Sequence, residues 1–287
     1  MEITQYKPGM MIEPGQTAIV AGMPNEVYHA HAHVSNSGLS LLARSPAHYR
    51  YAPPMEQTQA MMFGSAVHAA LLEPDVYERK YVRLKNVKDR RAAEYKAAVE
   101  VHGAEFVLMP SDVNKIETLR ASVESQPTVA AALRSDGWRE LSFFAVDPET
   151  EAPIRCRFDL LTHDFVSIDL KTTRDARATE FSKSVLTYRY HVQEIFYRHV
   201  FKCATGNDLT EFKFAAVESE PPHAAKLYTL DQTARMEGYS EFRRFLDQYA
   251  ECESSGQWPM YGDNEEVISL PDYKLRQIEN ELQEEII

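Results

Sequence analysis

The sequence lacks several features that would place it in a known class of protein. Its 287 residues include only three cysteines, Cys156, Cys203 and Cys252, which are widely spaced and form no Cys-x-x-Cys pair. Three thiols cannot make an even disulfide framework, nor can they supply the four thiolates of an iron–sulfur cluster. We therefore expect a protein of a reducing cytoplasm.

Membrane, secretion and motor signals are also missing. No run of about 18 apolar residues occurs, so we expect no membrane span. The first ten residues, MEITQYKPGM, lack the basic start and apolar core of a signal peptide. There is no internal repeat and no G-x-x-x-x-G-K-[ST] phosphate loop, which excludes a helicase motor.

Positive charge is scarce overall, because the formal net charge is −12. Much of the acidic excess lies in residues 248–287, with ten acidic and two basic side chains. By contrast, ERKYVRLKNVKDRRAAEYK (78–96) holds eight Lys or Arg and three acids. A local basic patch can bind a polyphosphate even on an acidic protein, and a solvated loop and helix start explain the same charges equally well.

The hydrophobic period changes near residue 136, from a helical to an alternating pattern. We expect an α/β domain over residues 1–287, with a mainly helical part at 28–135, a sheet core at 136–232 and C-terminal helices at 233–287. The segments expected to be helical are 35–45, 60–73, 90–102, 111–134, 175–186, 188–205, 231–252 and from about 271. The expected strands are 138–147, 153–162, 165–173, 211–219 and 224–231.

Charged residues interrupt two of these apolar strands in RCRFDLLTHDFVSIDLKTT, residues 155–173. Because strand side chains alternate between faces, Asp159, Asp169 and Lys171 can converge if the strands are hairpin neighbours. The same alternation predicts which apolar side chains share a face: Cys156, Phe158 and Leu160 on the first strand, and Val166, Ile168 and Leu170 on the second.

Two neighbouring carboxylates repel each other unless a cation lies between them. Oxygen ligands on rigid strands suit Mg²⁺, and a lysine beside such a site can hold a water or stabilise charge on a phosphate. The pattern therefore indicates metal-assisted hydrolysis of a phosphodiester. The alternative is a surface hairpin whose solvent face carries two aspartates and a lysine.

Three further motifs accompany these strands. FGSAVHAALLEP places His68 on a helix four residues after Gly64, and YRYHVQEIFYRHV places Gln193 and Tyr197 one helical turn apart. SNSGLSLLARSPAHYRY forms a helix that ends in S-P-x-x-Y. Together with D-x9-D-L-K-T-T, their order resembles the PD-(D/E)XK nuclease superfamily, in its RecB-like branch. It is similar to the nuclease domain of RecE-type exonucleases (exonuclease VIII) and related phage proteins, over residues 28 to about 200.

The resemblance implies a PD-(D/E)XK core, in which a central mixed sheet is flanked by helices. It also implies a Mg²⁺-dependent 5′-to-3′ exonuclease, phage or prophage encoded, acting in the bacterial host cytoplasm. Such an enzyme degrades linear double-stranded DNA from its ends and leaves 3′ single strands for recombination. A RecT-like single-strand annealing partner and a ring-shaped trimer or tetramer are further implications. The alternatives are another RecB-like DNA-processing nuclease and a catalytically silent DNA-binding protein of the same fold.

The resemblance also assigns roles to individual residues. Asp159 and Asp169 are the implied metal ligands, joined by the backbone carbonyl of Leu170, and Lys171 positions the attacking water. His68 completes the site, and its imidazole makes Mn²⁺ an alternative metal.

Five other residues belong to the expected surroundings of this site. Gln193 and Tyr197 support it or contact the DNA strand. Glu140, in WRELSFF, is either an acidic residue of the metal site or an exposed strand glutamate. Thr172 and Thr173 either donate hydrogen bonds to phosphate oxygens or are simply good strand residues.

DNA binding to an acidic protein requires positive charge only along the DNA path. Contacts to phosphates carry no sequence information, so cutting independent of sequence is expected. Aromatic side chains that stack on bases can help to part a duplex, and Tyr49, Tyr188 and Tyr190 are available. The candidate phosphate contacts are Lys80, Arg83, Lys85, Lys88, Arg90, Arg91, Arg174, Arg177, Lys183 and Arg189.

Overall fold

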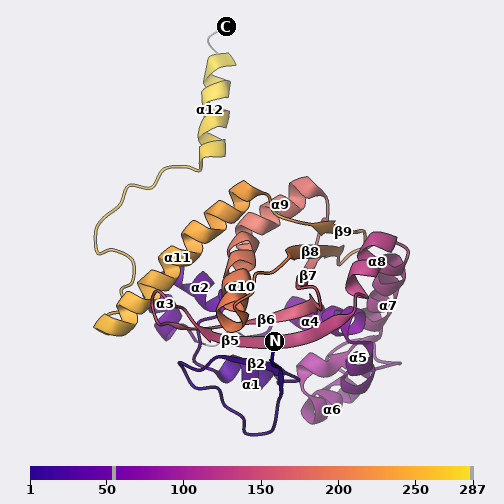
Figure 1. The fold of residues 1–287 in the computed structure, drawn as a ribbon. Helices are drawn as coiled ribbons and strands as arrows, with labels where there is room; N and C mark the ends of the chain where they lie inside the picture. Colours follow the sequence, from indigo (N-terminus) through magenta and orange to yellow (C-terminus); the bar gives the residue numbers. More distant parts are fainter. Residues whose placement is uncertain (54–55, 285–287) are drawn as a thin grey trace.

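A seven-stranded mixed sheet forms the centre of the computed structural model (Figure 1), with the strand order β1-β2-β5-β6-β7-β8-β9. The structure describes residues 1–53 and 56–284, and for 280–284 the backbone only. The strands of the sheet are β1 (Thr4–Gln5), β2 (Ala18–Ala21), β5 (Gly137–Val146), β6 (Pro153–Thr162), β7 (Val166–Thr173), β8 (Glu211–Glu218) and β9 (Ala225–Tyr228). A small separate sheet pairs β3 (Val82–Arg83) with β4 (Val107–Leu108).

Helices cover both faces of the sheet (Figure 1). On one face a phenylalanine-rich core packs under α10 and α11, and on the other a smaller aliphatic core packs under α4, α7 and α8. This arrangement confirms the α/β class and the mixed sheet flanked by helices. The helices are α1 (Asn25–Ala30), α2 (Asn36–Leu42), α3 (Pro46–Tyr51), α4 (Gln59–Leu72), α5 (Pro74–Lys80), α6 (Ala93–His102), η1 (Ala104–Phe106), α7 (Pro110–Glu124), α8 (Pro127–Leu133), α9 (Ala178–Thr187), α10 (Tyr190–Thr205), α11 (Gln232–Ser255) and α12 (Asp272–Glu284).

The pairing around β6 and β7 opens a gap in the sheet. β5 and β6 pair antiparallel along their length, and β7 and β8 pair parallel over eight residues. β6 and β7, in contrast, are paired only at Leu160–Ile168 and Leu161–Ser167. Beyond that point the Leu170 N–H of β7 donates to the side-chain carboxylate of Asp159 on β6. The two strands therefore diverge where their aspartates lie.

The predicted side-chain alternation of β6 is wrong at Leu160. Cys156 and Phe158 belong to the phenylalanine-rich core as expected, but Leu161 continues that core, and Leu160 packs in the opposite one. Facing this point on β5, Glu140 adopts φ +50°, in the left-handed region that non-glycine residues rarely use. The regular pleat is interrupted there, next to Asp159.

The single helix predicted for residues 111–134 is also wrong, because the segment forms α7 and α8. Pro127 begins α8. A proline has no N–H to donate, and it disfavours helical backbone at the preceding Gln126, so the helix breaks before it. The short helix α5 between Pro74 and Lys80 was not predicted, and Pro74 likewise occupies its first turn.

The ends of the chain add elements to this core. Near the N-terminus, β2 pairs with β5, and β1 pairs with β2 at the edge of the sheet. At the other end, α12 stands apart from the rest of the molecule (yellow in Figure 1), and residues 285–287 lie outside the described part. Within residues 1–53 and 56–284, no helix is long and apolar enough to cross a membrane.

Candidate active site

Asp159 and His68 meet at the point where β6 and β7 diverge. Oδ2 of Asp159 accepts the Leu170 N–H at 2.8 Å and lies 3.5 Å from Nδ1 of His68. His68 comes from α4, which crosses this face of the sheet and buries Ala66, Val67 and Ala70 beneath it. The structure therefore places a histidine 91 residues earlier in the sequence (159 − 68) beside the strand aspartate.

Glu140 completes a cluster with these two residues. The ligand atoms of His68, Glu140 and Asp159 all lie within 4.8 Å of one another, the one such group of three or more in the described part of the chain. Burial and the negative charge of Asp159 raise the pKa of Glu140 to about 8, and the guanidinium of Arg157, 3.9 Å away, only partly offsets them. An imidazole and two crowded carboxylates are a donor set that a divalent cation fits, since its charge would relieve their repulsion.

Asp169, Lys171 and Gln193 form a second, adjoining group. Nζ of Lys171 lies 2.8 Å from Asp169 Oδ2 and donates to Gln193 Oε1 at 2.9 Å. Nε2 of Gln193 donates to Asp169 Oδ1 at 2.7 Å, which closes a ring of three polar side chains. The structure therefore brings together the three predicted residues, with Asp169 turned toward Lys171 and Gln193 and not among the three clustered ligand atoms.

The charges within this ring are fixed by burial and by one another. Burial raises the pKa of Asp169 to about 6, although the ammonium of Lys171 opposes the rise. Burial alone would lower the pKa of Lys171, but Asp169, Tyr190 and Asp159 together outweigh it and raise that pKa. Lys171 is thus a cation at neutral pH, suited to stabilise negative charge and not to accept a proton.

Tyr197 lies among aromatic rings. Its ring packs edge-on against Phe158 at 5.3 Å and Phe212 at 6.0 Å between centroids, and burial raises the pKa of its hydroxyl well above the usual value. Within the described residues it makes no hydrogen bond to Asp159 or Asp169. Its surroundings are those of a packing residue one turn beyond Gln193.

Two neighbours of the site were not assigned to it from the sequence. Nζ of Lys171 lies 4.5 Å from the centre of the Tyr190 ring, at the start of α10. Arg157 approaches Glu140 and donates to the Met23 carbonyl, so it also ties the N-terminal segment to the site. The alternation of β6 placed Arg157 and Asp159 on one face, which was the available signal. Nothing in the local pattern indicated Tyr190 as a partner of Lys171.

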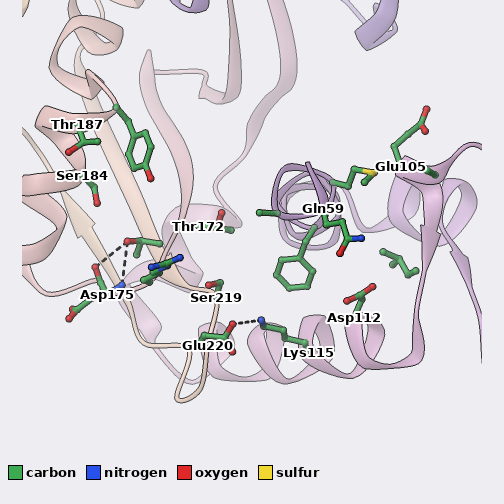
Figure 2. Close-up of a pocket in the computed structure, with 18 of the residues that line it drawn as sticks. Gln59, Glu105, Asp112, Lys115, Thr172, Asp175, Ser184, Thr187, Ser219 and Glu220 are labelled. Carbon is green, nitrogen blue, oxygen red and sulfur yellow. Dashed lines mark hydrogen bonds and ion pairs between the residues drawn. The ribbon is translucent and has the colours of Figure 1, made fainter. Parts of the chain in front are cut away.

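A cavity of about 860 Å³ opens beside the lysine strand. Thr172 and Ser219 lie between its two walls (Figure 2), with Ser184 and Thr187 of α9 on one side and Gln59 of α4 and Asp112 of α7 on the other. Both predicted threonines, Thr172 and Thr173, line it. The lining includes none of the six residues of the two polar groups, but the cavity adjoins them through Thr172, next to Lys171 along β7, and through Tyr190, whose ring contacts Lys171.

The cavity is not strongly basic, because its lining holds four basic and five acidic side chains. Arg90 is paired with Asp112, and Lys115 is paired with Glu220 (dashed in Figure 2). Arg174 is exposed and forms no hydrogen bond or ion pair with any described residue. It is the lining cation most available to a phosphate.

Lys183, a third predicted contact, also lines the cavity but is paired with Glu180. The remaining predicted DNA contacts lie outside the cavity lining. Arg91 is paired with Asp89, and Arg177 with Asp175. Lys85 and Lys88 are exposed near the small β3–β4 sheet. Of the ten candidate phosphate contacts, the structure therefore brings only Arg90, Arg174 and Lys183 to the cavity.

Comparison with known proteins agrees with this architecture. The structure of a candidate exonuclease from Eubacterium rectale covers 87% of this chain and 95% of its own, with a TM-score of 0.60 at 14% identity, a likeness of fold. A phage-related exonuclease from Haemophilus somnus 129PT covers 80% of this chain and 98% of its own at 11% identity, but its TM-score of 0.32 carries no weight. Among curated proteins, none matches.

The family assignment rests on a longer match. The family model of DUF3799, a PDDEXK-like domain of unknown function, matches residues 35–271. The matched residues include β5 to β9 and every residue of the two polar groups. The match supports the PD-(D/E)XK superfamily and does not single out RecE-type enzymes. The chain belongs to the DUF3799 family of PDDEXK-like domains.

Proposed function

We propose that this protein is a metal-dependent deoxyribonuclease that hydrolyses phosphodiester bonds. One observation carries the proposal: the cluster of His68, Glu140 and Asp159 adjoins the ring of Asp169, Lys171 and Gln193 where β6 and β7 part. A surface hairpin does not explain this arrangement, because Asp169 is only 3% exposed and Gln193 only 5%. Burying charged groups costs folding free energy, and such groups with shifted pKa values cluster at functional sites.

Each residue has a definite task in this chemistry. His68, Glu140 and Asp159 would hold Mg²⁺, with Mn²⁺ possible because of the imidazole. When bound, the ion supplies positive charge to the phosphate and acidifies a water molecule. The ammonium of Lys171 holds the attacking water and stabilises the charge that develops on the phosphate. Asp169 and Gln193 fix the position of Lys171 through the bonds described above.

The proposal extends to the polarity of cutting, the form of the DNA and the partner protein. We propose 5′-to-3′ exonuclease action on linear double-stranded DNA, leaving 3′ single strands for a RecT-like annealing partner in a bacterial host. The sequence resemblance supports this polarity, substrate and partner, and the fold is shared with a protein described as a candidate exonuclease. In a ring-shaped oligomer, the exposed basic residues Lys85 and Lys88 would contribute to an inner wall that contacts phosphates.

Digestion of linear and closed-circular duplex DNA tests the proposed function. We expect linear DNA to be degraded with Mg²⁺ and spared with EDTA, while circles remain intact and single strands accumulate. Substrates blocked at the 5′ or the 3′ end report the polarity. Cutting of circles would indicate an endonuclease of the same fold. Retention of DNA without cutting, with either Mg²⁺ or Mn²⁺, would indicate a silent binding protein.

A further inference from the structure

Three aromatic rings form a stack that leads from the core to the cavity. Phe214 of β8 is fully buried, and its ring lies 5.7 Å from that of Tyr190 with 24° between the planes. The Tyr190 ring lies 5.7 Å from that of Tyr188 with 26° between the planes. Both distances fall in the range of offset stacking. Tyr188, the last ring of the stack, is 62% exposed and lines the cavity.

The backbone holds the two tyrosines in this arrangement. Arg189, between them, adopts the left-handed conformation (φ +55°), a strained backbone for a long side chain. Its guanidinium is paired with Glu241 of α11, and it lies over the ring of Phe245. Because Arg189 is anchored to α11, the turn between α9 and α10 presents Tyr188 as a fixed surface and not as a free side chain.

Charge alone gives this cavity little attraction for a nucleic acid. Its acids outnumber its bases by one, and Arg90, Lys115 and Lys183 are already paired with acids. Single-strand binding proteins add base stacking on aromatic side chains to phosphate contacts, and stacking tolerates any sequence. A volume of about 860 Å³ is in the range of pockets that enclose a small ligand, and it accommodates a short piece of single strand.

We infer that Tyr188 is the platform on which a base of an unpaired DNA strand stacks, as the next member of the Phe214–Tyr190–Tyr188 stack. The inference rests on the proposed function and deepens it, because it names single-stranded DNA as the form that occupies the cavity. Tyr190 bridges the platform and the site, since its ring also lies against the Lys171 ammonium. A base on Tyr188 therefore places its strand close to the reacting phosphate.

Binding measurements with abasic DNA test this inference. The full chain carrying Lys171→Ala, which cannot position the attacking water, is titrated with fluorescent single strands that lack one base at successive positions. At one position, loss of the base should raise Kd about tenfold, the usual worth of one stacked base. Tyr188→Ala in the same background should raise Kd equally and should abolish the effect of the abasic position. Tyr188→Trp keeps an aromatic face and should restore it.

The outcomes separate this inference from the proposed function. If Tyr188→Ala leaves Kd and the abasic profile unchanged, the platform is wrong, even if the Lys171-containing protein degrades DNA. If the coupling between Tyr188 and one base is found but no metal supports cutting, the platform stands and the nuclease proposal fails. If the Lys171→Ala chain binds no single strands, with or without Tyr188, the platform fails, and the digestion of duplex DNA alone decides the nuclease proposal.

Discussion

Replacement of Gln193 by leucine tests how the polar ring holds the site. The amide of Gln193 donates to Asp169 at 2.7 Å and accepts from Lys171 at 2.9 Å. Leucine fills a similar volume but removes both bonds. The ion pair between Lys171 and Asp169 at 2.8 Å remains, but neither side chain is then held in position by the amide of Gln193.

The magnitude follows from these contacts. Each hydrogen bond to a charged group contributes roughly 1.5–3 kcal/mol, and the added apolar burial returns part of that. We expect Gln193→Leu to lower the free energy of unfolding by about 3 kcal/mol. Because a reoriented Lys171 no longer faces the phosphate, we expect the cutting rate to fall roughly 10–100-fold, as for other residues that support a metal site.

Urea unfolding and the initial rate of DNA degradation measure the two effects. Gln126→Leu is the matched control, because the Gln126 amide also bridges two groups: it accepts the Ala225 N–H at 2.7 Å and donates to the Ser122 carbonyl at 3.0 Å. It lies between α7 and α8, away from the polar ring. The control should lose stability and keep its rate per folded molecule. Equal rates per folded molecule for the two variants would refute the reasoning.

Three other predictions concern charge. Arg174→Ala should weaken DNA binding and lower the slope of log affinity against log salt by about 1, whereas Arg177→Ala, whose guanidinium is already paired with Asp175, should change neither in a salt titration. Burial alone would lower the pKa of His199, but its hydrogen bonds to Asp147 and Cys203 and the negative charges of these groups together raise that pKa from 6.5 to about 9. This stabilisation is complete below about pH 6.5 and is lost toward pH 9, so urea midpoints should fall more steeply over that range in wild type than in His199→Gln. Burial raises the pKa of Glu140 from 4.5 to about 8, so between these pH values the metal-free fold retains a proton that the unfolded chain loses. The melting temperature of the wild-type chain in EDTA should therefore fall as the pH rises from 4.5 to 8. A parallel fall in Glu140→Gln would contradict this assignment.

The sequence predicted the part of the fold that depends on local pattern. Alternation identified β5 to β8 to within one residue at each end and located β9 with an end three residues too late, and the helical period identified α9, α10 and α11. Prediction from local pattern failed where tertiary packing overrides that pattern. Leu160 lies in the opposite core because the pleat is interrupted beside Glu140, whose positive φ no local signal indicates.

The sequence indicated which residues form the candidate site better than it indicated which residues contact one another there. Alternation on β7 placed Asp169 and Lys171 on one face, and family resemblance added His68 and Gln193. The partner that each charge finds depends on distant segments, such as Asp112 for Arg90. For that reason the basic stretch at 78–96 suggested more free cations near the site than the cavity presents.

The most direct measurement is the cleavage of an end-labelled linear duplex by the wild-type chain and by Lys171→Ala, each titrated with Mg²⁺. The account predicts Mg²⁺-dependent release of label by wild type and a loss of release in the variant, while circular dichroism shows both chains folded. Release at the wild-type rate by folded Lys171→Ala would contradict the central claim that this site performs the hydrolysis.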